Sequence, residues 1–250
     1  MTWLVDMGNT RIRWCREERA GLSSVQSAVY VNRAVGEVLN GLWVPRGAVH
    51  VVSVAPEVTN HALADWIHAQ GGGPVVFHAT PARGNGLVNS YPEAATMGVD
   101  RWAAMVGGRT LMEGAYCVID CGSALTVDVV DAAGLHQGGG IVPGFRLMSG
   151  ALTGETARIL VGDSGMGGGA LGTDTAACVS AGVEAAVIGG ALELIRRGEE
   201  QLDCELPRLL CGGDAERIRL AVQPCRYVPD LVLRGLAAMA RDVPLPQTRC

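Results

Sequence analysis

The chain has 250 residues, of which 48% are hydrophobic, and a formal net charge of −5. This length fits one large domain or two of ordinary size, and the composition predicts a folded protein. The charges are scattered, so no basic face is expected to bind nucleic acid. All twenty basic residues are arginines, which excludes a Walker-type phosphate loop, a Schiff-base lysine and a lysine general base.

The cysteines and the N-terminus indicate the compartment. Eight cysteines form no C-x-x-C pair, and Cys117 and Cys121 would lie about 13 Å apart in a strand, too far to share one metal ion. We expect buried thiols that pack as small hydrophobic groups in a reducing cytosol. Asp6 and Arg11 interrupt the N-terminus before an apolar core can form, so no signal peptide is expected and the location should be cytoplasmic.

The first half of the chain opens with a predicted β-hairpin. Its strands, residues 2–6 and 10–16, are joined by Asp6-Met7-Gly8-Asn9-Thr10. The elements expected next are a strand at 25–31, helices at 33–43 and 57–69, and strands at 49–54 and 74–78. Residues 80–95 predict a long loop, of the kind that is often functional. A helix should follow with Asp100 and Arg101 in its first turn, where a carboxylate can serve as a cap.

The second half begins with a hairpin of the same kind. An apolar strand at residues 117–119 leads to Asp120, and Gly122 and Ser123 form a tight turn before a second apolar strand. Glycine lets the turn close tightly, and its amides and the hydroxyl group become donors that suit a phosphate, whereas the carboxylate suits a cation. Because each half of the chain opens with an acid-glycine-hydroxyl hairpin, we expect two similar domains that face a shared ligand.

The remaining elements are a strand at 135–142, a helix entered through residues 143–148, a long helix at 173–201, a strand at 208–211, a helix at 215–222 and a final helix to about Asp242. Residues 161–172 are dense in glycine, and 167–172 match a dinucleotide fingerprint. We interpret them as a loop, because no clear strand precedes them. Residues 176–195 are apolar enough for a membrane span, but Glu184 lies at their middle. A helix packed through small residues, in the core or against a second subunit, is the preferred interpretation.

Together these elements predict two domains, residues 1–113 and 114–250, each a mixed sheet flanked by helices, with a cleft between them. Asp6 and Asp120 would lie on opposing sides of this cleft, where a metal-bound nucleoside triphosphate could neutralise them. Phosphoryl transfer needs donors on the phosphates, a cation and a base for the acceptor hydroxyl. Asp100 is the most plausible base, since it is apart from both turns and beside the cation Arg101.

Motifs along nearly the whole chain resemble type III pantothenate kinases, of the superfamily of acetate and sugar kinases, heat-shock chaperones and actin. They are Asp6-Met-Gly-Asn-Thr10, Asn89-Ser-Tyr91, Gly98-Val-Asp-Arg101, Asp120-Cys-Gly-Ser-Ala124, Gly139-Gly-Ile-Val-Pro-Gly144, Thr175, Gly212-Gly-Asp-Ala215 and Pro229-Asp-Leu-Val-Leu-Arg-Gly235. The resemblance implies an α/β fold of two ribonuclease H-like (actin-like ATPase) domains. It also implies ATP-dependent phosphorylation of pantothenate at its terminal hydroxyl, the first step of coenzyme A biosynthesis.

The resemblance also assigns roles to individual residues. Asp100 would be the catalytic base, and Asp120 would bind a monovalent cation, potassium or ammonium, beside Mg²⁺ on ATP. A homodimer is implied, with the substrate site near the subunit interface. The residues implied to bind ATP are Asp6, Met7, Gly8, Asn9, Thr10, Arg11, Ile12, Arg13 and Ser123. Those implied to line the pantothenate site are Tyr91, Gly98, Val99, Arg101 and Thr175.

Ser123 departs from the family pattern, which usually has threonine there. The hydroxyl group is kept and one methyl group is lost, so we expect a small change in ATP affinity. Two alternatives stay open: another small-molecule kinase of the superfamily, which would need different residues around 89–101, and a non-catalytic regulator on the same fold. The regulator would predict loss of Asp6, Asp100 or Asp120, and all three are present.

Overall fold

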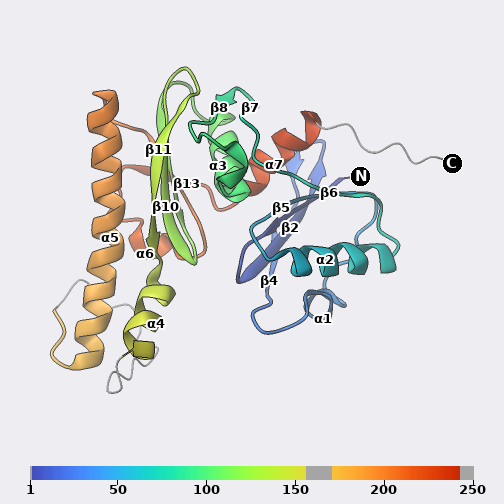
Figure 1. Ribbon diagram of the computed structural model, residues 1–250, viewed down its shortest axis with the longest axis horizontal. Coiled ribbons are helices and arrows are strands. Elements are labelled where there is room, and N and C mark those ends of the chain that lie inside the picture. Colours follow the sequence, from blue (N-terminus) through green and yellow to red (C-terminus); the bar gives the residue numbers. More distant parts are fainter. Residues whose placement is uncertain (1, 156–170, 243–250) are drawn as a thin grey trace. The chain divides into compact units, whose positions relative to one another are not determined.

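The computed structural model of the protein describes residues 2–155 and 171–242 (Figure 1). Within it the chain forms two compact units. The first consists of Met1–Glu113 with Asp230–Cys250, and the second of Gly114–Pro229. This division differs from the expected second domain over residues 114–250, because the C-terminal helix belongs to the first unit.

That helix, α7 (Leu231–Asp242), packs against α3 (Val99–Arg109). Glycines allow the two backbones to touch. A Cβ atom on Gly107 would lie 2.3 Å from the carbonyl oxygen of Leu231, and one on Gly235 would lie 1.7 Å from that of Ala103. Only glycine fits at these two positions. The sequence-based boundary followed chain order, and nothing in the sequence identified which helix the two glycines contact.

The first unit is built on a mixed sheet. Its strands run in the order β3 (Gly21–Leu22), β2 (Arg11–Glu18), β1 (Thr2–Met7), β5 (Ala48–Ser53), β6 (Val75–Phe77), and β4 (Gln26–Val29) also pairs with β2. The hairpin pair β1–β2 is antiparallel, with Asp6 opposite Arg13, whereas β5 runs parallel to both β1 and β6. The predicted hairpin and the third strand beside it are therefore confirmed.

Alternation along these strands explains where the core lies. Val5, Met7, Val49 and Val51 belong to one buried cluster with residues of α1 (Val35–Leu39) and α2 (Glu57–Ala69). Successive side chains point to opposite faces of a sheet, so Asp6 and His50 face the other way. Helix α7 contacts β1 and β5, and α3 contacts β5.

Two of the expected elements have different bounds. Helix α1 spans five residues rather than 33–43, since Asn40 leaves the helical conformation and Gly41 follows with φ +76°. The predicted loop at 80–95 contains a small hairpin, β7 (Arg83–Gly84) with β8 (Leu87–Val88), and a 3₁₀ turn, η1 (Ala94–Thr96). This segment leads directly into α3, whose N-cap is Gly98.

The second unit has a five-stranded mixed sheet. Its strands run in the order β11 (His136–Pro143), β10 (Ala124–Val130), β9 (Tyr116–Cys121), β12 (Arg208–Cys211), β13 (Cys225–Tyr227). The predicted hairpin corresponds to β9 and β10, while β12 runs parallel to β9 and places Cys211 beside Asp120. Short strand β13 was not predicted. Helices α4 (Phe145–Glu155) and α6 (Ala215–Ile218) follow β11 and β12, and α6 is shorter than the expected 215–222.

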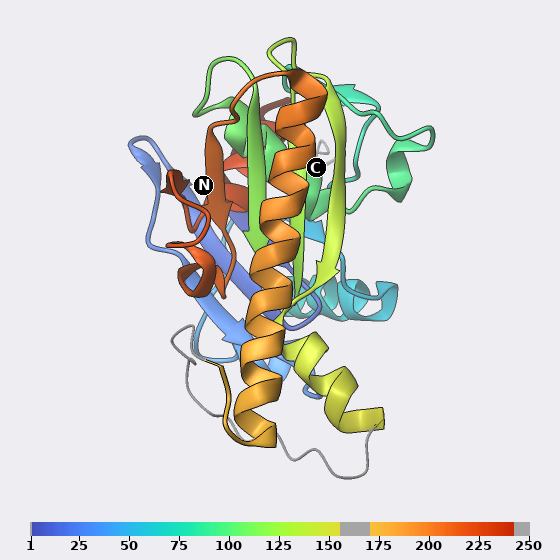
Figure 2. The same ribbon diagram turned by 90° about the vertical axis from the view of Figure 1, so that its left-hand side faces the viewer.

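Helix α5 (Thr175–Leu202) lies along this sheet (Figure 2). It buries Val183, Val187, Ala191 and Ile195 in the core of the unit. Its length and composition would suffice for a membrane span, and 22% of its most apolar window is buried. Glu184 interrupts that window, and the helix contributes one row of side chains to a protein core, as a helix packed on a sheet does. The glycine-dense residues 161–170 lie outside the described residues.

The described cysteines differ in burial, and Cys225 is intermediate between the buried and the exposed ones. Cys15, Cys117, Cys121 and Cys211 are buried, and burial raises the pKa of the first three thiols to about 12. These thiols stay protonated and pack as apolar groups. The expectation of buried thiols was wrong for Cys178 and Cys204, which are exposed. Cys178 lies in the first turns of α5, and Cys204 follows the end of that helix.

Candidate nucleotide and substrate site

The first candidate element is the turn between β1 and β2. Gly8 donates its N–H to the carbonyl oxygen of Arg11 at 3.0 Å, which closes the turn. The Tyr30 hydroxyl donates to the Gly8 carbonyl oxygen, and the Tyr30 N–H donates to the Thr10 carbonyl oxygen at 3.1 Å. Asp6 is half-buried at the end of β1, and Asn9 is exposed at the tip. The turn is therefore held rigidly by a tyrosine that the sequence analysis did not identify.

Not all of the predicted ATP-binding residues of this turn can contact a ligand through their side chains. Met7 and Ile12 are fully buried in the core of the first unit, so only their main-chain groups can meet a ligand. Arg11 is exposed and Arg13 is half-buried, and the Arg11 guanidinium donates to the Ser27 hydroxyl at 3.4 Å. Residues 6–13 thus offer main-chain donors and polar side chains at alternate positions, as a hairpin requires.

Asp100 lies in the first turn of α3, at the same end of the sheet. Its Oδ1 accepts the Arg101 N–H at 2.8 Å. The expectation that Asp100 caps the helix was wrong, because the N-cap residue is Gly98 and no side chain caps the helix. A Cβ atom on Gly98 would lie 2.7 Å from that oxygen and 3.7 Å from Val54 Cγ1. Val54 in turn donates its N–H to the Met7 carbonyl oxygen at 3.1 Å. Through Val54 the structure brings the Asp6–Thr10 turn and Asp100 together within one unit.

Arg101 is buried beside Asp100, with 8% of its surface exposed. Its Nη1 donates to the Tyr91 hydroxyl at 3.0 Å, and the guanidinium lies 5.8 Å from the centroid of the Tyr91 ring. Tyr91 is held in place because its N–H donates to Asn89 Oδ1 at 3.0 Å. The predicted substrate-binding residues of the first unit, Tyr91, Gly98, Val99 and Arg101, therefore surround the start of α3.

Two further residues position this group. The Thr80 hydroxyl donates to the Met97 carbonyl oxygen at 2.9 Å, and Asn89 Nδ2 donates to the Met97 sulfur at 3.7 Å. Both side chains are buried polar groups, and they fix the segment that enters α3. Thr80 was missed in the sequence analysis, because a single threonine at the edge of a predicted loop carries no distinctive pattern.

The second unit holds the other predicted turn, after β9. Gly122 donates its N–H to the Ala124 carbonyl oxygen at 2.9 Å, and the side chain of Asp120 is half-buried beside the turn. Gly212 has φ +100°, and a Cβ atom there would lie 2.5 Å from Asp120 Oδ1 and 2.3 Å from the Cys121 carbonyl oxygen. Glycine at 212 thus leaves room around the Asp120 carboxylate that any other residue would fill.

A third segment meets the same turn. Gly144 donates its N–H to the Ser123 carbonyl oxygen at 3.1 Å, and a Cβ atom on Gly144 would lie 2.6 Å from the carbonyl oxygens of Gly122 and Ser123. The Asp214 N–H donates to the Cys121 carbonyl oxygen at 2.8 Å. The ends of β9, β11 and β12 therefore converge around Asp120 and Ser123.

No group of three or more His, Cys, Asp or Glu side chains in residues 2–155 and 171–242 is placed to hold a metal ion. The Asp120 carboxylate nevertheless suits a cation whose remaining ligands are oxygen atoms of other groups. Its carboxylate stands in the space kept open by Gly212, and hard cations accept carbonyl, water and phosphate oxygens beside one carboxylate.

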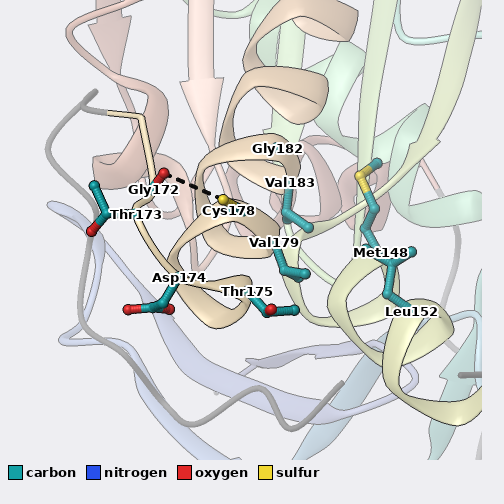
Figure 3. A pocket seen from close by; sticks show the side chains of 10 residues that line it. All are labelled: Met148, Leu152, Gly172, Thr173, Asp174, Thr175, Cys178, Val179, Gly182 and Val183. Atoms are coloured by element: carbon teal, nitrogen blue, oxygen red, sulfur yellow. Dashed lines mark hydrogen bonds between the residues drawn. The ribbon is translucent and has the colours of Figure 1, made fainter. Parts of the chain in front are cut away.

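Thr175, the last predicted substrate-binding residue, is the first residue of α5 and is exposed. It lines a pocket of about 600 Å³ between α4 and the start of α5 (Figure 3). Asp174 caps the helix by accepting the Ala177 N–H at 2.9 Å, and Cys178 Sγ donates to the Gly172 carbonyl oxygen at 3.3 Å. The lining is largely apolar, and it includes neither Asp120 nor Ser123. How the two units are placed decides whether Thr175 joins the other predicted residues, so the cleft stays a prediction.

Comparison with known proteins identifies the family. The family model of type III pantothenate kinases matches residues 3–197. A type III pantothenate kinase of Nitrosococcus oceani is 34% identical over 256 residues, which cover 97% of this chain and 94% of the relative. The chain belongs to the type III pantothenate kinases. The resemblance inferred from the motifs is thereby confirmed.

Solved structures agree with this family at the level of the fold. A conserved protein from Campylobacter jejuni, assigned as a Baf family transcriptional activator, matches with a TM-score of 0.61 and 20% identity, covering 96% of this chain and 98% of that one. A protein assigned as a 2-dehydro-3-deoxygalactonokinase from Sinorhizobium meliloti matches with a TM-score of 0.56 and 13% identity, covering 100% and 99%. The predicted α/β fold class, with two ribonuclease H-like units of mixed sheet and helices, is confirmed for this pantothenate kinase family member.

Proposed function

We propose that the protein transfers a phosphoryl group from ATP to the terminal hydroxyl of pantothenate, the first step of coenzyme A biosynthesis. The observation that carries this proposal is family membership: the family model matches residues 3–197, and a relative is 34% identical over 97% of this chain. Two hairpin turns, each with a carboxylate and a hydroxyl residue beside a glycine, support it. A kinase needs such donors for the phosphates of its nucleotide.

Within this proposal, Asp100 is the base that accepts the hydroxyl proton of pantothenate. Its carboxylate lies at the N-terminus of α3 and accepts the Arg101 N–H at 2.8 Å. Both the hydrogen bond and the helix dipole stabilise the negative charge that a proton acceptor needs. Tyr91, Gly98, Val99 and Arg101 then form the wall of the pantothenate site beside it. Thr175, at the start of α5, is the remaining residue that we propose for pantothenate binding.

The proposed ATP site combines residues 6–13 with Ser123. Gly8, Asn9 and Thr10 supply turn donors, Met7 and Ile12 contribute through their main chain, and Ser123 contributes its hydroxyl. The nucleotide brings Mg²⁺, which supplies charge neutralisation at the transferred phosphate. Asp120, in the space left by Gly212, would hold the monovalent cation, potassium or ammonium.

A homodimer in the cytoplasm completes the proposal. Helix α5 has a long row of small residues, and 22% of its most apolar window is buried within one chain. A second copy packed on that surface would cover apolar groups that a single chain leaves exposed. A cytoplasmic location follows from the substrates, since ATP and the coenzyme A pathway are found there.

The test is a coupled enzyme assay that measures the release of ADP from ATP in the presence of pantothenate. It is run first with a potassium salt and then with a sodium salt alone. We expect pantothenate-dependent turnover that requires potassium. Folded protein that gives no turnover in either salt would contradict the proposed substrate and would call for a panel of other small hydroxylated acceptors. Equal turnover in both salts would contradict only the cation site at Asp120.

A further inference from the structure

Arg217 is an arginine whose guanidinium is positioned by stacking. It lies on α6, and its Cζ atom is 3.5 Å from the centroid of the Phe145 ring. Phe145 is itself 2% exposed and belongs to the core of the second unit, so the platform is rigid. Stacking engages one face of the guanidinium and leaves the N–H groups at its edge available.

Those edge donors have no protein partner in the described part of the chain. Apart from Phe145, the Arg217 side chain makes no hydrogen bond or ion pair among residues 2–155 and 171–242. Arg219, two residues further on, differs, because its Nη1 bonds to Glu216 Oε1 at 3.1 Å. Arg217 is half-buried, whereas Arg219 is exposed. Because Arg217 is only half-buried, its unused donors meet water in the free protein and stay available to a ligand.

The Arg217–Phe145 stack is connected to the predicted phosphate-binding turn that follows β9. Phe145 directly follows Gly144, which lies against the Gly122 and Ser123 carbonyl oxygens. Asp214, in the segment that leads into α6, donates its N–H to the Cys121 carbonyl oxygen at 2.8 Å. Both sides of the Arg217–Phe145 stack are therefore tied to the residues that flank Ser123.

The charges around this turn need a cation. Asp120, Asp214 and Arg217 all act electrostatically on the Cys121 thiol, the two carboxylates raising its pKa and the arginine lowering it. A polyphosphate that approached this turn would meet two carboxylates and one fixed cation. Of the residues acting on Cys121, Arg217 alone can donate to a phosphate oxygen through a planar fork.

We propose that Arg217 is a further nucleotide-binding residue, which rests on the proposed kinase function. Held flat against Phe145, its edge N–H groups donate to phosphate oxygens of the ATP that docks at the Asp120–Ser123 turn. The stack fixes the fork before the nucleotide arrives, so little side-chain entropy is lost on binding. The recognised chemistry is a phosphate oxygen rather than the base or the ribose.

The test compares Arg217→Met, which keeps the length and apolar contact but removes the charge and donors, with the matched control Arg219→Met. Dissociation constants for Mg-ATP and for adenosine are measured by calorimetry, and KM is measured for ATP and for pantothenate. We expect Arg217→Met to weaken ATP binding by about tenfold to a hundredfold. Adenosine binding and the KM for pantothenate should stay at the parent values, as should all four quantities in Arg219→Met.

Two results would overturn the assignment. The first is that folded Arg217→Met binds ATP with an affinity within twofold of the parent value. The second is that the variant loses the same factor of affinity for adenosine as for ATP, which would place the contact at the nucleoside. If Arg217→Met does not fold, Arg217→Gln replaces it in the test, because glutamine is polar but carries no charge and no guanidinium fork, and parental ATP affinity of that variant would refute the proposal. Calorimetry also separates the proposed role of Arg217 from the proposed kinase function. If the parent protein binds ATP but does not phosphorylate pantothenate, the kinase proposal is refuted, and the effect of Arg217→Met on ATP binding can still be measured.

Discussion

Replacement of Gly235 by alanine tests whether α7 is an integral part of the first unit. The new Cβ atom would lie 1.7 Å from the Ala103 carbonyl oxygen, which is 1.7 Å short of the 3.4 Å at which ordinary contact begins. The atom that it meets belongs to the backbone of α3, so no side chain can rotate away and the helices must separate. Overpacking costs about 1–3 kcal/mol and more against rigid groups, while alanine gains about 1 kcal/mol in helix propensity.

We therefore expect Gly235→Ala to lower the free energy of unfolding by about 2 kcal/mol, which corresponds to a fall in Tm of about 4–8 °C. Turnover should fall as well, because α3 carries Asp100 in its first turn. Thermal unfolding followed by circular dichroism measures the first effect. The matched control is Gly150→Ala in α4, where a Cβ atom would meet nothing within 4 Å; there we expect a gain of about 0.5–1 kcal/mol. A Tm for Gly235→Ala at or above the parent value would refute the proposed helix contact.

Two further predictions concern Asp100 and the adjacent histidines His50 and His78. Asp100→Asn keeps the shape and removes the base, so we expect turnover to fall by about 10²–10⁴ with ATP binding kept; turnover within a factor of two of the parent would exclude Asp100 as the base. His50 Nδ1 and His78 Nε2 lie 2.9 Å apart, and burial lowers both pKa values, that of His78 from 6.5 to about 4. The unfolded chain therefore binds more protons below pH 6.5, and stability should decline by about 1–2 kcal/mol between pH 6.5 and about pH 5. Urea unfolding at both pH values measures this, and His78→Asn should reduce the decline; an unchanged decline would show that other groups cause it.

Local patterns predicted the parts of the fold that depend on near neighbours. The alternation through Trp3, Val5, Ile12 and Trp14 predicted the first hairpin, and the apolar run before Asp120 predicted the second, because each strand buries one face against its own unit. The same alternation could have shown that Met7 is buried as well. The family motif assigned whole segments to ATP, and a motif does not distinguish side-chain from main-chain contacts.

Features that depend on distant partners could not be predicted in this way. The packing of α7 on α3 depends on Gly107 and Gly235 meeting across more than a hundred residues of sequence. The stacking of Arg217 on Phe145 likewise joins two elements that no spacing connects. Thr80 and Tyr30 position the site through single hydrogen bonds to main-chain carbonyl groups, and such bonds leave no periodic trace in a sequence.

The return of α7 to the first unit affects how the chain can be synthesised and divided. During translation the second unit, Gly114–Pro229, is complete before the helix that finishes the first unit has been made. The first unit must therefore wait, with the surface of α3 that receives α7 uncovered, until the end of the chain leaves the ribosome. An excised fragment of residues 1–113 would lack that helix, whereas one of residues 114–229 would contain every strand of its own sheet. A shortened chain that ends before Leu231 should consequently be a substrate for cellular proteases rather than a slower enzyme.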